Sequence, residues 1–402
     1  MSYQPSRCTP REELESRTAR LQELMKAKDL DGAIIIQNAD LFYFAGTVQR
    51  SHLFIPAEGE PVLLVRKNYQ RAKCESALKD IRGLTNAKDL PGLIESHLGY
   101  RASRIGFELD VMPASLFLYY QQLLDPVQIA DASNLIRQVR SIKSPYEIEL
   151  IRGAAALNHT MFSQVRDFLR PGMTEVELGS KLEGVYRTLG HQCFIRTRSF
   201  NMELVYGHLM SGWNAGVPSF MDSPTGGSGL NPSFPQGAGM KRIEPNEPIL
   251  IDYVGVLDGY MVDQARIFCI GKLSPELVYA HNVAIEVQEL VKEMAKPGVS
   301  CADVYASALQ LVGKHGLKQH FMGYPDSVGF IGHGIGIELD EMPVIARGYD
   351  VPLEEGMVLG LEPKFVFPQG TVGIENTLVV TPDGLENLTV FDENIIFLPY
   401  NA

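Results

Sequence analysis

Short apolar runs alternate with charged stretches of helical pattern over the first 140 or so residues of the chain. A charged helix is expected through LQELMKAKDL (21–30) and another around NYQRAKCESALKD (68–80). Three apolar runs have strand length, namely GAIIIQ, HLFI and PVLLV. Such alternation predicts an α/β domain with a mixed sheet.

A domain boundary is predicted in the segment SIKSPYE. Ser144 can cap a helix whose first turn contains Pro145 and Glu147. The long helix expected through YEIELIRGAAALNHTMFSQVRDFL then opens a second domain. We therefore expect one domain over residues 1–143 and another over residues 144–402.

Two segments of the second domain match each other in register. LRPGMTEVELGSKLEGVYRTLG (169–190) and AKPGVSCADVYASALQLVGKHG (295–316) share Pro-Gly, a Thr or Ser cap, an acid, a helix and a closing glycine. A chance match is the alternative, because Pro-Gly before a capped helix is a common start signal. A true duplication predicts two similar halves with an active site between them.

Acidic residues stand where apolar ones belong in the strand pattern PILIDYVGVLDGYMVDQARIFCIG. Asp258-Gly259 is a two-residue hairpin signal between β-branched runs. Counting back from that turn places Val254 opposite Asp263, and Asp252 shares a face with Val254. Asp252 and Asp263 are therefore expected as diagonal neighbours, about 7–8 Å apart, within reach of a common ligand.

The second half repeats this anomaly. Glu362 and Glu375 lie in apolar strands that flank a Pro-Gln-Gly turn, and His333 starts the run HGIGIELDEMP. Each residue alone has an ordinary structural reading, but buried carboxylates must be paired or bound to a metal. Four carboxylates with one imidazole suit two divalent ions, with Mn, Co, Zn or Fe favoured over Ca or Cu. Such ions can supply hydroxide at neutral pH and polarise a carbonyl.

Composition narrows the class of partner. The net charge of −12 and the lack of a concentrated basic stretch argue against nucleic acid and anionic membranes. The five cysteines have no CxxC spacing, so we expect reduced thiols rather than disulfides or a zinc knuckle. We find neither a signal-peptide core nor a run of the ~20 apolar residues that a membrane span needs, and expect a cytoplasmic protein.

Five segments resemble the pita-bread metallohydrolases, the family of aminopeptidase P, prolidase, methionine aminopeptidase and creatinase: IKSPYEIELIRGAA, IDYVGVLDGYMVDQARIF, GHGIGIELDEMP, GMVLGLEP and GIENTLVV. The resemblance implies an α/β N-terminal domain followed by an α+β pita-bread domain with an internal pseudo-two-fold repeat. It also implies a homodimer formed through the first domain. The positions that match the family's dinuclear metal ligands are Asp252, Asp263, His333, Glu362 and Glu375, with Glu362 also in the role of proton acceptor.

Asp340 departs from the family pattern. The family's peptidases have a second histidine seven residues after the one that corresponds to His333. An imidazole can donate a hydrogen bond to a carbonyl, whereas an ionised aspartate only accepts. We therefore expect Asp340 to favour a substrate with a donor, such as an ammonium, guanidino or amide N–H, or to be held protonated by nearby carboxylates. The alternative is a surface acid beside Glu338 and Glu341.

A second auxiliary histidine is also replaced. In the segment SGWNAGVPSF the position holds Ser219, a candidate for substrate binding, and an alternative alignment near Ser233 lacks histidine too. His208 is a candidate to supply the missing imidazole if the Gly/Ser/Pro-rich loop after Ser219 folds back over the site. Lys364 and Gly373 are smaller departures, which we expect on the substrate side of the site rather than at the ligands.

These observations predict a dinuclear metal hydrolase that cleaves a C–N amide bond, with a bridging hydroxide as nucleophile. The substrate is a short peptide with proline after the scissile bond or a small non-peptide amide. Loss of the two histidines is compatible with activity, since acid–base assistance contributes ~10²–10⁴-fold and the metals supply the rest. Two alternatives are a protein that only binds a peptide or partner, and a metal-free enzyme of creatinase type. The complete ligand set argues against both.

Overall fold

The computed structural model describes residues 5–400, which form two compact units. The first unit comprises the chain up to Arg140 together with residues 198–200, and the second comprises residues 141–197 and the chain from Asn201 onward. This division falls within a few residues of the boundary expected after residue 143.

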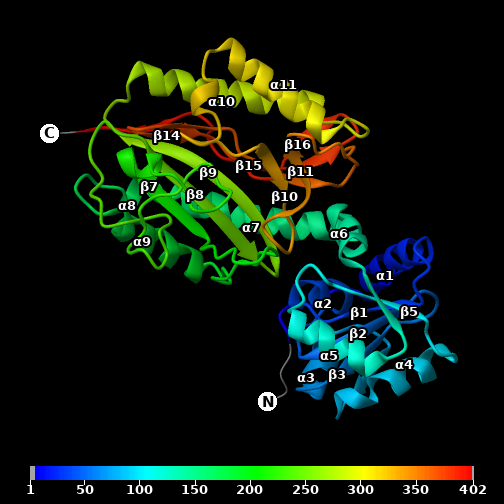
Figure 1. Ribbon diagram of the computed structural model, residues 1–402. Coiled ribbons are helices and arrows are strands. Elements are labelled where there is room, and N and C mark those ends of the chain that lie inside the picture. Colours follow the sequence, from blue (N-terminus) through cyan, green and yellow to red (C-terminus); the bar gives the residue numbers. More distant parts are fainter. Residues whose placement is uncertain (1–4, 401–402) are drawn as a thin grey trace. The chain divides into compact units, whose positions relative to one another are not determined.

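The first unit is a mixed six-stranded sheet with helices packed on it (Figure 1). Its strand order is β4-β3-β2-β1-β5-β6; the pairs β1–β2 and β2–β3 are antiparallel and the other three are parallel. The predicted mixed α/β sheet is therefore confirmed. The strands are β1 (Gly32–Ile35), β2 (Ser51–Pro56), β3 (Val62–Val65), β4 (Asp80–Gly83), β5 (Arg104–Phe107) and β6 (Gln128–Asp131), and the helices are α1 (Arg11–Lys26), α2 (Asn38–Ala45), α3 (Tyr69–Glu75), α4 (Leu90–Leu98), α5 (Ala114–Leu124) and α6 (Ser133–Ser141).

One predicted helix of this unit is shorter than expected. The segment 68–80 forms α3 only as far as Glu75, because Ser76 takes an extended backbone and the chain then enters β4. The apolar side chains of the sheet and of α4 and α5 form the core of the unit.

The second unit contains two larger sheets and a hairpin. The first sheet has the order β17-β9-β8-β7, and the second has the order β11-β10-β12-β15-β16. Their strands are β7 (Gly207–Ser211), β8 (Ile249–Leu257), β9 (Tyr260–Ile270), β10 (Phe330–Gly334), β11 (Glu341–Ala346), β12 (Val358–Leu361), β15 (Asn376–Thr381), β16 (Gly384–Asn387) and β17 (Ile396–Leu398). The hairpin of β13 (Lys364–Phe367) and β14 (Gly370–Gly373) stands between β12 and β15 in the chain.

Helices cover the outer faces of these sheets. In Figure 1, α7 (Pro145–Ser163), α8 (Val165–Phe168) and α9 (Glu175–Thr188) lie along one side, and α10 (Pro275–Met294) and α11 (Cys301–Lys314) along the other. Helix α7 packs on β8 and β9, whereas α10 packs on the β13–β14 hairpin and β16. The interior between these layers is apolar, which makes the acids described below exceptional.

The helix signals read from the sequence are confirmed. Ser144 and Glu147 form a capping box at the start of α7. In the repeated segments, Thr174 caps α9 and Ser300 caps α11, and both helices have 14 residues. Gly190 and Gly316, which close the two segments, both have positive φ, at 94° and 72°. The two halves of the unit are therefore built alike at this level.

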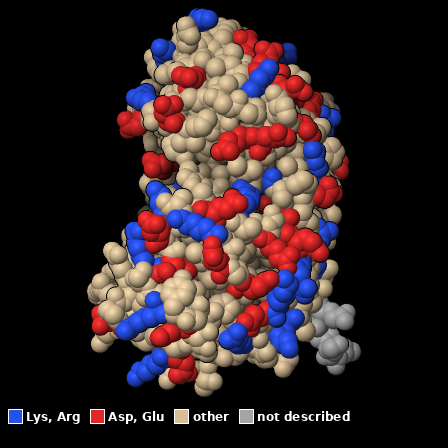
Figure 2. All heavy atoms as spheres, turned by 90° about the vertical axis from the view of Figure 1, so that its right-hand side faces the viewer, with Lys and Arg blue, Asp and Glu red and all other residues tan. Residues whose placement is uncertain are grey.

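Charged side chains of both signs are interspersed over the face in Figure 2, without a broad basic area on that face of the described chain. All five cysteines are free thiols, as expected. Within residues 5–400, no helix has the length and apolar character needed to cross a membrane.

Candidate metal centre

The β8–β9 hairpin places two aspartates on one face. Val254 pairs with Asp263, and Asp252 pairs with Ala265, two residues further along the partner strand. This is the register expected from the Asp258-Gly259 turn, so the diagonal arrangement of Asp252 and Asp263 is confirmed. Both carboxylates are buried.

The second sheet supplies the imidazole and two glutamates. His333 on β10 pairs with Gly360 on β12. A Cβ at residue 360 would lie 3.1 Å from His333 Nε2, so the glycine leaves the ring its space. Glu362 follows the last residue of β12 and Glu375 precedes the first residue of β15, so both lie one residue outside the strands at the same end of the β12–β15 ladder.

Backbone contacts join the two sheets at this point. The amide of Ala265 donates to the carbonyl of Glu375 at 3.3 Å, and the amide of Glu375 donates to the carbonyl of Ala265 at 3.2 Å. Thr377 Oγ1 accepts from the Asp263 amide at 2.8 Å and donates to the Asp263 carbonyl at 2.9 Å. Asp263 is thereby fixed beside Glu375, although the two residues are distant in the sequence.

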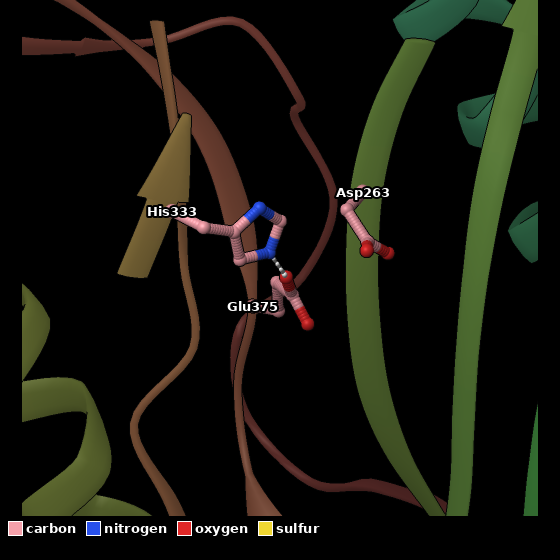
Figure 3. A group of neighbouring side chains, drawn as sticks. All are labelled: Asp263, His333 and Glu375. Atoms are coloured by element: carbon pink, nitrogen blue, oxygen red, sulfur yellow. Dashed lines mark ion pairs between the residues drawn. The ribbon is translucent and has the colours of Figure 1, made fainter. Parts of the chain in front are cut away.

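Asp263, His333 and Glu375 converge on one point (Figure 3). Each offers one ligand atom, and these atoms lie within 4.8 Å of one another. His333 Nδ1 lies 2.9 Å from the Leu339 carbonyl, to which it can only donate, and Nε2 faces Glu375 Oε1 at 3.7 Å, an ion pair when the ring is protonated. Loss of the Nε2 proton would leave that atom free to bind a metal ion. A backbone partner on the far nitrogen is typical of a histidine that binds a metal.

Two fully buried oxygen atoms of this group have no hydrogen-bond partner within residues 5–400, namely Asp263 Oδ1 and Glu375 Oε1. A buried polar atom without a partner costs about 1–3 kcal/mol, and a charged one costs more. A divalent cation between these oxygens and His333 Nε2 would remove that cost. The residues present therefore fit a metal ion.

Lys364 is the unexpected member of the group. Its Nζ lies 2.7 Å from Asp252 Oδ2, 2.8 Å from Glu362 Oε2 and 2.8 Å from Glu375 Oε2. The side chain is 2% exposed. Lys364 borders the cavity described below, but the expectation that it would not touch the ligands is wrong, because its ammonium contacts three of the carboxylates.

The lysine also sets the charge of its neighbours. Burial opposes ionisation of Glu375, but Lys364 and His333 outweigh it and lower the pKa of this carboxyl to about 2. For Glu362, burial outweighs the attraction of Lys364 and raises the pKa to about 7. Burial also opposes the charge of Lys364, yet the three surrounding carboxylates hold its pKa well above the usual value. The sequence offered one signal for this contact: a lysine in an apolar strand must find a counter-charge.

A cavity of about 100 Å³ opens onto these residues, and Asp340 lines it. The Asp340 side chain is 35% exposed, and Oδ1 lies 3.6 Å from His333 Nδ1. Glu338 and Glu341, expected as surface acids in the alternative reading, are buried, and Glu341 pairs with Lys143 at 3.0 Å. Asp340 thus stands at the cavity and not on an acidic surface patch.

His208 lines the same cavity, but the loop does not carry it there. It lies on β7 directly opposite Asp252. Burial, followed by the charge of Lys364, lowers its pKa to about 3, so the ring is neutral. Gln236 Nε2, in the loop after β7, lies 3.5 Å from His208 Nδ1, a neighbour that the sequence did not indicate.

The Gly/Ser/Pro-rich loop does reach the site, but not through the serine that we expected. Met221, Asp222 and Ser223 line the cavity, whereas Ser219 is not among its lining residues. Ser219 Oγ instead accepts a hydrogen bond from the Met221 amide at 3.0 Å and donates one to Gln236 Oε1 at 3.3 Å. It thus contacts the glutamine that neighbours His208.

Comparison with known proteins agrees with this geometry. The model of metallopeptidase family M24 matches residues 149–382, and that of the creatinase/prolidase N-terminal domain matches residues 17–142. The Xaa-Pro dipeptidase of Lactobacillus helveticus is 26% identical over 391 residues, which cover 94% of this chain and 98% of that protein.

Solved structures show the same architecture. The Xaa-Pro dipeptidase of Bacillus anthracis superposes with a TM-score of 0.82 at 23% identity, over 96% of this chain and 100% of that one. The X-Pro aminopeptidase of Thermotoga maritima gives 0.78 at 24% identity, over 94% and 100%. Because the family model spans more than half of its length, the chain belongs to metallopeptidase family M24.

Proposed function

We propose that this protein is a metal-dependent hydrolase of C–N amide bonds, with short Xaa-Pro peptides as the first substrate class and small non-peptide amides as the second. The observation that carries the proposal is the convergence of Asp263, His333 and Glu375 with two unpartnered buried oxygens. The names of the similar dipeptidases support the choice of substrate.

The donor set favours Mn, Zn, Co or Fe, since it combines one imidazole with carboxylate oxygens. When bound, such an ion lowers the pKa of water and polarises the amide carbonyl. The sequence predicts two ions shared among Asp252, Asp263, His333, Glu362 and Glu375. Lys364 already engages three of these carboxylates, which bears on how many ions the centre holds.

Side chains that line the cavity are candidates for proton transfer and substrate binding. Glu362 lines the cavity; its Oε2 accepts from Lys364, and its Oε1 lies 4.0 Å from His333 Nε2. These contacts support Glu362 as the group that accepts a proton from the attacking water. Asp340 lines the cavity and can accept a hydrogen bond from a substrate ammonium. Neutral His208, which lines the same cavity, can orient a polar group of the substrate. A cavity of about 100 Å³ suits a small substrate.

The test is hydrolysis of a panel of Xaa-Pro dipeptides and small amides by the full chain supplied with Mn²⁺, Zn²⁺, Co²⁺ or Fe²⁺. We expect Asp263→Asn to reduce turnover at least ~100-fold and to weaken metal binding. Asp258→Asn is the matched control, because Asp258 lies in the turn of the same hairpin and does not line the cavity. Undiminished turnover in Asp263→Asn would refute the proposal, and metal binding without turnover on any substrate would favour a role in peptide binding.

A further inference from the structure

We propose that the ammonium group of Lys364 takes the place of one of the two cations, so that the centre binds a single divalent ion. This rests on the metal-dependent function proposed above and adds the number of ions and the group that replaces the second. Three observations carry it: the contacts of Lys364, the ligand atoms that it leaves free, and the room made for its side chain.

The contacts of Lys364 use every donor that it has. An ammonium group carries three N–H bonds, and Nζ has three carboxylate oxygens at 2.7–2.8 Å. These oxygens come from β8 and from the ends of β12 and β15, which are the elements that carry the candidate ligands. Lys364 therefore bridges both halves of the unit, as a metal ion bound by these carboxylates would. Each of these three oxygens already accepts a hydrogen bond from the lysine.

The fully buried ligand atoms that remain describe one site. Asp263 Oδ1 and Glu375 Oε1 are the two fully buried carboxylate oxygens of the group without a hydrogen-bond partner in the described chain. With His333 Nε2 they complete a set close enough for a single ion. Glu375 thus divides its oxygens, with Oε2 on Lys364 and Oε1 free for a cation. It bridges an ammonium and a metal site rather than two metal sites.

Repulsion between like charges points the same way. Four ionised carboxylates with the ammonium and one divalent ion carry a net charge of −1, and with two divalent ions they would carry +1, so the net charge alone does not decide between the two. The position of the charges does, because a second divalent ion would lie against the ammonium, and two like charges a few ångströms apart repel strongly at low dielectric.

The β13–β14 hairpin leaves space for the buried side chain of Lys364. Residue 364 pairs with Gly373 across the β13–β14 hairpin. A Cβ at 373 would lie 2.7 Å from Lys364 Cα and 3.1 Å from its Cγ, so the absence of a side chain there gives the lysine stem its path. Lys364 is buried against the three carboxylates and also borders the cavity.

The experiment counts ions. Metal-free full-length protein is titrated with Mn²⁺ by calorimetry, and the loaded protein is examined by electron paramagnetic resonance. We expect one equivalent in the native protein, with the spectrum of an isolated ion. Lys364→Ala is expected to bind a second equivalent and to show the spin coupling of two neighbouring ions. Lys364→Met keeps the buried stem without the charge and serves if the alanine variant does not fold.

Lys241→Met is the matched control, because Lys241 forms a partly buried ion pair with Glu247 at 2.6 Å, and its other partners, Ser211 and Arg242, are not candidate ligands. It is expected to retain the native stoichiometry. Two coupled ions in the native protein would overturn the inference and leave the proposed hydrolase intact. One ion in both the native protein and the Lys364 variants would also overturn it, since removal of the ammonium would then not allow a second ion to bind. No ion in any variant would refute the metal-dependent function itself.

Discussion

Gly373 lies directly opposite Lys364 in the β13–β14 hairpin, and the backbone before and at residue 364 fills the space that a side chain at 373 would need. The added Cβ would stand 2.5 Å from the Pro363 carbonyl oxygen as well as against Lys364. The sequence resemblance predicts that both positions depart from the family pattern. The geometry connects the two residues, because a side chain at 373 would press on the stem of the lysine that contacts the candidate ligands.

We predict that Gly373→Ala destabilises the second unit by about 3 kcal/mol or more. The substitution adds backbone strain at a φ of 150° to overlap with fixed backbone atoms. Urea unfolding followed by the fluorescence of Trp213, the single tryptophan, measures this. Gly298→Ala is the control, since Gly298 also has positive φ (89°) but open space around it, and it should lose only about 1–2 kcal/mol. Equal losses in the two variants would show that the contact with residue 364 is unimportant.

Several parts of the site were predictable because they follow from local rules. A two-residue turn fixes the pairing of its strands by counting, so Asp258-Gly259 placed Asp252 and Asp263 correctly. Ser144 and Thr174 cap helices through contacts within a few residues, and these signals held as well. Neither kind of inference needs knowledge of the tertiary fold.

The remaining parts depend on contacts between distant segments. His208 reaches the cavity because β7 pairs with β8, and no turn next to it indicates that pairing. Asp263 meets Glu375 through a backbone bridge at Ala265, between strands far apart in the chain. The direction of the Lys364 side chain depends on how the β13–β14 hairpin folds over the ligands. A pattern of alternating residues gives the faces of a strand but not what lies across from each face.

Asp340 gives a prediction about substrate choice. It lines the cavity and, when ionised, can only accept hydrogen bonds, so it should favour substrates with a free ammonium group. We expect Asp340→Asn to raise KM for such dipeptides about 10-fold, the effect of losing roughly 1.4 kcal/mol from a charged hydrogen bond, with a smaller change in kcat. Steady-state kinetics measure KM on paired substrates, one with a free and one with an acylated amino group. The rise in KM should be confined to the substrate with the free amino group. A KM that rises equally for both would show that Asp340 does not contact the ammonium.

We predict that the stability of the first unit depends on pH through the titration of His52. This ring lies on β2, with Nε2 2.6 Å from the Tyr120 hydroxyl and Nδ1 without a partner. Burial, followed by the charges of Arg66 and Arg50, lowers its pKa from 6.5 to about 4. Above pH 6.5 the ring is neutral in both the folded and the unfolded chain, so it adds no pH dependence there. Between pH 6.5 and 4 only the unfolded chain takes up the proton, and stability falls as the pH falls.

The loss over that range should be about 3 kcal/mol, since each pKa unit corresponds to ~1.4 kcal/mol. Hydrogen exchange of the β2 strand, corrected for the intrinsic effect of pH, measures it in the unit concerned. Glu108 in the same unit acts with the opposite sign, because burial and then Asp40 raise its pKa to about 8. The contribution of His52 is therefore the difference between the native protein and His52→Gln, whose β2 protection should decline less between pH 6.5 and 4. Parallel profiles for the two proteins would mean that His52 is protonated as easily in the folded state as in the unfolded one.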